Sequence, residues 1–136
     1  MAFRYDIDPS IDLQVVQAEG VVTDDDVYDY IRTAAADPRA AGVTRVLCDL
    51  RRIDKLEVSA TTIRALADPA RSVPNRRRAF VVGDDVTYGM LRMYQIMTDS
   101  DEAALGLFRD EAEARAWLDL AADYRPPFDW DEAGTP

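Results

Sequence analysis

The chain of 136 residues contains no histidine. Histidine is the commonest general base and zinc ligand in enzymes, and it usually activates a catalytic serine or cysteine. Its absence argues against these kinds of catalytic site. The chain has one cysteine, so no internal disulfide can form, which fits a reducing compartment. Because Cys48 lies in an apolar run with no histidine to activate it, we interpret it as a small core hydrophobe.

Basic residues are few, and long apolar runs are absent. The 26 acidic residues outnumber the 16 basic ones, and the net charge of −10 argues against duplex DNA or an anionic membrane as partner. No stretch approaches the roughly 20 apolar residues that span a bilayer. The first ten residues lack the apolar core of a signal peptide. We therefore expect a cytoplasmic protein with no nucleic-acid partner, no integral membrane segment and no cofactor.

What the sequence does contain is an alternation of short strands and helices. The apolar spacing predicts strands at 3–8, 13–18, 45–50, 78–82 and 105–108. It predicts helices from Thr23 to Asp37, from Ser59 to about Arg71, from Val86 to about Thr98, and after Asp110. Residues 1–122 then form one α/β domain, and residues 123–136, which include Phe128 and Trp130, form a C-terminal tail.

This order predicts a mixed sheet of about five strands. The short first connection indicates an antiparallel hairpin, and strands that alternate with helices indicate parallel pairing and right-handed crossovers. If each strand is added beside the previous one, the crossover helices all lie on one face of the sheet. We then expect the opposite face to be covered by the tail, a second subunit or an apolar ligand.

The third strand ends in polar groups at the point where parallel sheets place binding sites. Asp49, Arg51 and Arg52 follow its apolar run. They are candidates for contact with a ligand or partner. The alternative, which we favour, is an ion pair or a turn-capping carboxylate.

Other polar motifs have simple structural interpretations. Ser59 opens a helix, where capping is favoured over phosphorylation. The arginine run 76–78 is favoured as a solvated loop over an anion site. Asp84 and Asp85 follow a buried strand, but one of them is placed to cap the next helix, so we expect no metal site.

The third helix carries an unusual set of adaptable apolar side chains. Core packing is the favoured interpretation, and a subunit interface or a ligand wall is the alternative. The candidate surface consists of Tyr88, Met90, Arg92, Met93, Tyr94 and Met97.

Several segments resemble a bacterial family of small STAS-like proteins with a SpoIIAA-like fold, related to CRAL-TRIO domains. The resemblance rests on CDLRRID from Cys48, EVSATTIRAL, the strand followed by two aspartates, YGMLRMYQ from Tyr88 and FRDEAEARAWL from Phe108. It covers roughly residues 3–120. It implies a β-α superhelix with about four helices mainly on one sheet face, and no catalytic residues. Classical anti-sigma-factor antagonists, which these proteins resemble in fold, are phosphorylated on a serine just after the third strand. Here Arg51 and Arg52 follow Asp49 and Ser59 comes later, so we do not expect phosphorylation of Ser59.

Three functions remain open at this point. The leading hypothesis is a non-enzymatic STAS-like protein-interaction or regulatory module that acts as a homodimer or with an unidentified protein partner. The second is a binding protein for a lipid or other apolar small molecule, which uses the uncovered sheet face and the third helix. The third is an enzyme built on carboxylate, arginine and tyrosine groups, from Asp49, Tyr88 and Arg92 with the two aspartates that precede the helix.

Overall fold

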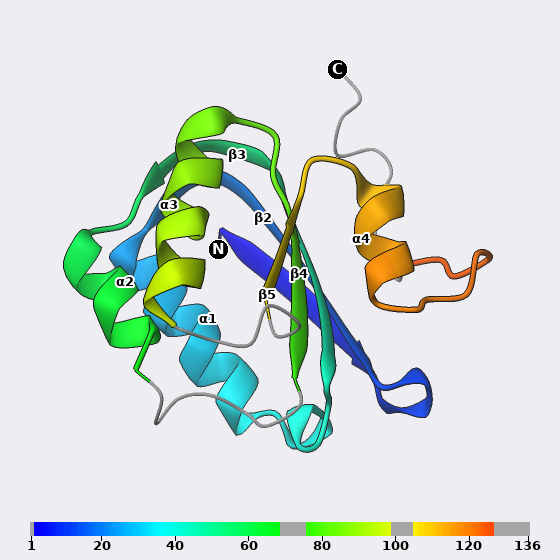
Figure 1. Ribbon diagram of the computed structural model, residues 1–136. Helices are drawn as coiled ribbons and strands as arrows, with labels where there is room; N and C mark the ends of the chain where they lie inside the picture. Colours follow the sequence, from blue (N-terminus) through cyan, green and yellow to red (C-terminus); the bar gives the residue numbers. More distant parts are fainter. Residues whose placement is uncertain (1, 69–75, 99–104, 127–136) are drawn as a thin grey trace.

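The computed structural model describes residues 2–68, 76–98 and 105–126, which form one five-stranded sheet with helices on both faces (Figure 1). The strands lie side by side in sequence order. β1 and β2 are antiparallel, and the remaining neighbours are parallel. The predicted mixed pairing is therefore confirmed, and the strands have the sequential order that the sequence analysis took as its condition. The strands are β1 (Phe3–Asp8), β2 (Leu13–Thr23), β3 (Arg45–Glu57), β4 (Arg77–Val81) and β5 (Leu105–Phe108).

Three helices cover one face of the sheet, which we name the near face (Figure 1). They are α1 (Asp24–Ala36), α2 (Ala60–Leu66) and α3 (Asp85–Met97). Each follows a strand whose next neighbour is parallel, so a common hand places all three on the same side. Their inner side chains pack on alternate residues of the central strands, among them Val16, Cys48 and Leu50. Two single-turn 3-10 helices, η1 (Pro9–Ile11) and η2 (Pro38–Ala40), lie in the connections.

The opposite face, which we name the far face, carries the fourth helix, α4 (Glu111–Trp117) (Figure 1). Ala114 and Leu118 pack on the far-face residues of β2, β3 and β4. Tyr124, in the segment after α4, packs against the same cluster. The far face was expected to be covered by the tail, a second subunit or an apolar ligand; the chain's own α4 covers most of it, and Tyr124 of the predicted tail contributes. α4 follows the last strand, so no return crossover holds it on the near face, and it covers the far face itself with help from the following segment.

β2 and β3 are longer than their patterns indicate. The second strand is predicted to end at residue 18, but β2 continues to Thr23, and Gly20 lies inside it with a positive φ of 74°. The pairing register between β2 and β3 shifts at this point, which is how a bulge continues a strand. β3 runs on to Glu57, through a charged stretch that pairs with residues 19–23. The result is a two-stranded extension of the sheet beyond its five-stranded part.

The helix starts are fixed by side-chain caps, as their sequences predict. Thr23 and Asp26 form a reciprocal capping box at α1. Ser59 caps α2, Asp84 caps α3 and Asp110 caps α4, each by accepting a backbone N–H. The predicted extension of the second helix to Arg71 falls partly outside the described residues. Within the described part of the chain, no helix is both long and apolar enough to cross a bilayer.

We predict that Gly106→Ala destabilises the fold. An added Cβ at Gly106 lies 2.6 Å and 2.9 Å from two ring atoms of Phe108 and 3.3 Å from Trp117. Phe108 and Trp117 already pack together with ring centroids 5.6 Å apart, so the rings must shift. We expect a loss of about 1–2 kcal/mol in the free energy of unfolding, measured in urea.

Gly83→Ala is the matched control for this prediction. Its Cβ contacts only Arg51, at 3.6 Å or more, and we expect a change within about 0.5 kcal/mol. Equal stabilities of the two variants contradict the assigned role of Gly106.

Candidate interaction site

Asp49 lies on the far face of β3 and is completely buried. Its carboxylate accepts hydrogen bonds from the backbone N–H and the Nε of Arg51, both at 2.9 Å, and from Arg51 Nη2 at 3.0 Å. Gln17, which pairs with Asp49 across β2 and β3, donates to it at 3.3 Å. The carboxylate therefore has four hydrogen bonds from within the chain and no exposed surface for a partner.

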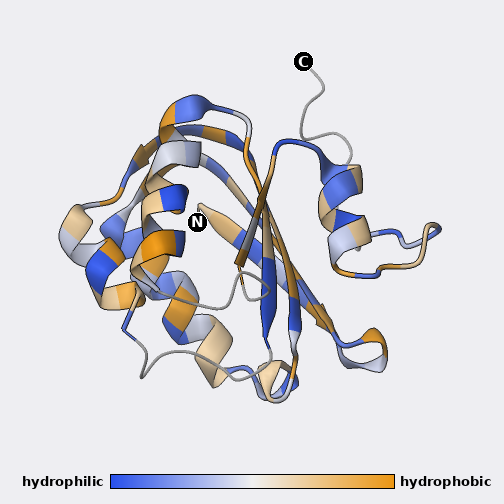
Figure 2. Ribbon diagram, viewed as in Figure 1, coloured by the Kyte–Doolittle hydropathy of each residue, from blue (hydrophilic) through white to orange (hydrophobic). Residues whose placement is uncertain are grey.

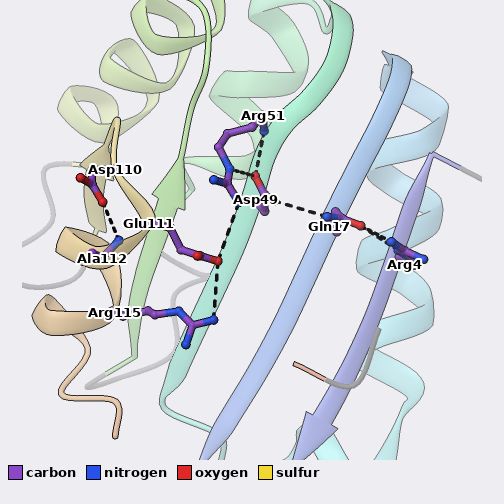
Figure 3. A network of polar contacts seen from close by, with 8 residues as sticks. All are labelled: Arg4, Gln17, Asp49, Arg51, Asp110, Glu111, Ala112 and Arg115. Carbon is purple, nitrogen blue, oxygen red and sulfur yellow. Dashed lines mark hydrogen bonds and ion pairs between the residues drawn. The ribbon is translucent and has the colours of Figure 1, made fainter. Parts of the chain in front are cut away.

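These contacts belong to a polar row that crosses the far face from β1 to α4 (Figure 3). At one end, Arg4 donates from Nε to Oε1 of Gln17 at 2.9 Å. At the other end, Glu111 of α4 lies 3.7 Å from Arg51 and 3.6 Å from Arg115. A buried charge is stable only when it is paired and hydrogen-bonded, and the row meets that condition for Asp49. The geometry favours the structural interpretation of Asp49 and Arg51.

The arginine run 76–78 is used inside the fold. Arg76 donates to the carbonyl of Val43 at 3.1 Å. Arg77 donates to the carbonyl of Trp117 at 3.0 Å, at the C-terminal end of α4. Arg78 donates to the hydroxyl of Tyr94 at 2.8 Å. None of the three arginines is arranged with the others to hold an anion.

Asp84 and Asp85 have separate partners. Asp84 accepts from the backbone N–H and the hydroxyl of Thr87, both at 2.8 Å, and that N–H is the main cause of its lowered pKa. Asp85 accepts from Arg109 at 2.7 Å, and the Arg109 guanidinium lies 4.5 Å from the ring centroid of Tyr88. Among residues 2–68, 76–98 and 105–126, no three acidic or cysteine side chains are grouped to hold a metal ion.

Cys48 and Ser59 have local structural roles. Cys48 is buried on the near face, and burial raises the pKa of its thiol, so it stays protonated at neutral pH. Ser59 accepts the N–H of Thr62 at 3.1 Å, and its own N–H donates to Asp24 at 2.8 Å. A phosphate on Ser59 would meet the carboxylate of Asp24, which opposes it electrostatically.

Part of the candidate surface on α3 faces the core. Tyr94 is buried, and Met90 and Met97 pack against the same cluster between α2, α3 and β5. Tyr88 is half-buried beneath Arg109. Tyr94, Met90 and Met97 therefore follow the favoured interpretation of the helix as a core element.

One side of the exposed surface of α3 carries apolar side chains from its first turn to its last. Val86, Met93 and Ile96 are 71%, 37% and 64% exposed. Together with Gly89, which is also exposed, they recur at spacings of three, four and three residues, which places them on one side of a helix. We name these four residues the α3 stripe. Arg92 is exposed at its margin.

The predicted site residues fall in two separate places. Asp49 and Arg51 lie on the far face, whereas α3 packs on the near face, so they do not form one site. Of the six predicted residues of α3, Met93 and Arg92 reach the exposed surface. Val86 and Ile96 were missed because the prediction followed the methionine and tyrosine content of the helix. The signal that identifies Val86 and Ile96 is their helical spacing from Met93, which places all three side chains on one side of the helix.

Comparison with solved structures supports the assigned fold. No protein-family model matches the sequence, and no curated protein is similar to it. Among solved structures, the chain is similar to an uncharacterised protein of the DUF3478 family with a SpoIIAA-like fold from Shewanella loihica. The TM-score is 0.54 at 18% identity, over 86% of this chain and 94% of that one. The chain therefore has a SpoIIAA-like fold, as its sequence resemblance implies.

We predict that Asp49→Asn destabilises the protein. The substitution places an amide where Arg51 and Gln17 donate, and it leaves the guanidinium of Arg51 without its main anionic partner. Since Arg51 retains some exposure to water, we expect a loss of about 2 kcal/mol in the free energy of unfolding, measured by urea denaturation.

The double variant Asp49→Asn/Arg51→Met provides the control. It removes both charges, so we expect it to recover part of the loss. A change below about 0.5 kcal/mol for the single variant contradicts the structural role of Asp49.

Proposed function

We propose that this protein is a non-enzymatic STAS-like interaction module that binds a protein through the α3 stripe. The observation that supports this is the row of exposed apolar side chains on a helix whose opposite side is well packed. Isolated exposed hydrophobic residues are common on protein surfaces and need no explanation. Three on one stripe of one helix form a continuous strip, and strips of this kind mark contact with another macromolecule.

The chemistry elsewhere supports a binding role over catalysis. Asp49 has no access to solvent, Asp84 caps a helix, and the Cys48 thiol is buried and protonated. Each of these polar groups is engaged in holding the fold. A general acid or base needs a group that can reach a substrate; Asp49 and Cys48 are buried, and the carboxylate of the exposed Asp84 is already bonded to Thr87.

The alternative of a lipid or apolar ligand loses its main support. It depended on an uncovered sheet face, and α4 and Tyr124 cover that face. A pocket remains at the edge of the far face, beside β1, and charged side chains contribute much of its lining. The lining residues are Asp6, Ile7, Asp8, Leu13, Val15, Tyr124 and Arg125. Such a lining does not suit an acyl chain.

We predict that a photo-crosslinking amino acid at position 96 forms protein adducts in the cells that make this chain. Ile96 is 64% exposed and belongs to the apolar stripe that we assign to binding. The matched control is position 21, because Val21 is 49% exposed but lies on β2 and outside the α3 stripe. The measurement is the amount and identity of adducts on a denaturing gel and by mass spectrometry.

We expect adducts at position 96 that disappear when Val86→Glu is added, and few at position 21. Val86→Glu lies on the exposed side of α3, so it does not disturb the core. Equal adducts at both positions, or none at position 96, contradict the proposed function.

A further inference from the structure

We infer that the α3 stripe pairs with the α3 stripe of a second copy of this chain, antiparallel, with the two helices crossing at Gly89. The inference rests on the proposed function and names the partner. Gly89 is the first observation that supports it. Glycine in the middle of a helix is unfavourable relative to alanine because it fixes a freer backbone.

Nothing within the described chain explains a glycine at this position. Its φ is not positive, and an added Cβ would meet no atom within 4 Å. By contrast, Gly106 makes room for Phe108, and Gly20 and Gly42 have positive φ. The space in front of Gly89 opens to the outside, on the apolar stripe. A close approach by another helix is the contact for which a glycine in this place is suited.

The helical turns before and after Gly89 carry side chains that complement each other in charge and in hydrophobicity. The turn before it presents Asp85 and Val86, and the turn after it presents Arg92 and Met93. At about 100° per residue, Asp85 and Arg92 lie along one flank of the stripe, and Val86 and Met93 lie along the other. One flank therefore carries an acidic and a basic side chain, and the other flank carries two apolar side chains.

A two-fold axis at Gly89 makes use of this arrangement. Helices related by an axis across them run antiparallel, and each flank of one helix meets the same flank of the other. The turn before Gly89 in one copy then faces the turn after Gly89 in the second copy. Asp85 of each copy then faces Arg92 of the other, and Val86 of each copy faces Met93 of the other, so each contact occurs twice. In a parallel pair each flank would meet the opposite flank, so the charged side chains would face apolar ones.

The charged side chains are positioned to make these contacts. Asp85 is 92% exposed even though it bonds Arg109, so its carboxylate has room for a second cation. Arg92 is exposed and donates to Gln95 one turn along the same helix. One helix per copy gives a smaller area than the roughly 800 Å² per partner of a stable interface, so we expect a weak, concentration-dependent dimer.

The decisive experiment is a charge exchange between copies. We expect wild-type protein to form dimers at high micromolar concentration in sedimentation equilibrium. Asp85→Arg and Arg92→Asp should each weaken self-association about tenfold, because each places like charges together at both contacts between positions 85 and 92. An equimolar mixture of the two variants should form a heterodimer. In that mixture the arginine introduced at position 85 of one variant meets the aspartate introduced at position 92 of the other, and the unchanged residues pair in the same way.

Gly89→Ala supplies an independent variant that is not at risk of unfolding. We expect its thermal midpoint to rise, because alanine favours the helix, while self-association weakens about tenfold, because the Cβ stands between the helices. An exposed alanine substitution that acts only on the monomer would raise the midpoint and leave the association constant unchanged, and that result overturns the inference.

The other outcomes are equally informative. If the wild-type chain stays monomeric at high micromolar concentration, or if the mixed variants fail to associate, the pairing is wrong. If position 96 at the same time forms adducts with a different protein, the proposed function stands and only this inference fails. If position 96 forms adducts with the chain itself and the exchange restores dimers, both are supported.

Discussion

The order of the strands is the constraint on which the rest of this structure depends. Each strand is added beside the one before it, so the connections of the parallel strands all return on the same side. α1, α2 and α3 are thereby committed to the near face. Only an element that follows the last strand is free to cover the far face, and α4 is that element. Figure 2 shows how apolar and polar residues alternate along the strands between these layers.

α4 is too short to be a stable helix by itself, so its position has to come from contacts with the sheet. It is held on the sheet by the burial of Ala114 in its middle and of Leu118 at its C-cap. Its C-terminal carbonyls receive the guanidinium groups of Arg45 and Arg77, which also suits the negative end of the helix. At its N-terminal end, Glu111 meets Arg51, which in turn holds the buried Asp49. The polar row is thus the means by which a short helix is fixed in register on the sheet.

The sequence predicted local features well and distant ones poorly. β5 was predicted to the residue and the start of α1 at Thr23 was predicted correctly, because these signals are contained in a few neighbouring residues. The length of β2 was missed because a glycine with positive φ at a bulge has the same sequence signature as a turn. The ion pair of Asp49 with Arg51 could be predicted from their spacing along one strand. Gln17 could not, because it lies 32 residues away in the chain and meets Asp49 only through the register of β2 and β3.

The candidate site shows the same division. Sequence composition singled out the right helix, but the methionines and tyrosines that distinguish it lie for the most part toward the core. Val86 and Ile96 are ordinary residues whose exposure is set by how α3 lies on the sheet, and this follows from packing and not from composition. With the near face covered by three helices and the far face by α4, Val21 is the one large apolar side chain of the described sheet that is exposed. The other exposed large apolar side chains of the described residues lie on the outer side of α3, and the glycine within that stripe lowers helix stability without a compensating contact inside the described chain. Both facts find one explanation when a second helix lies against it.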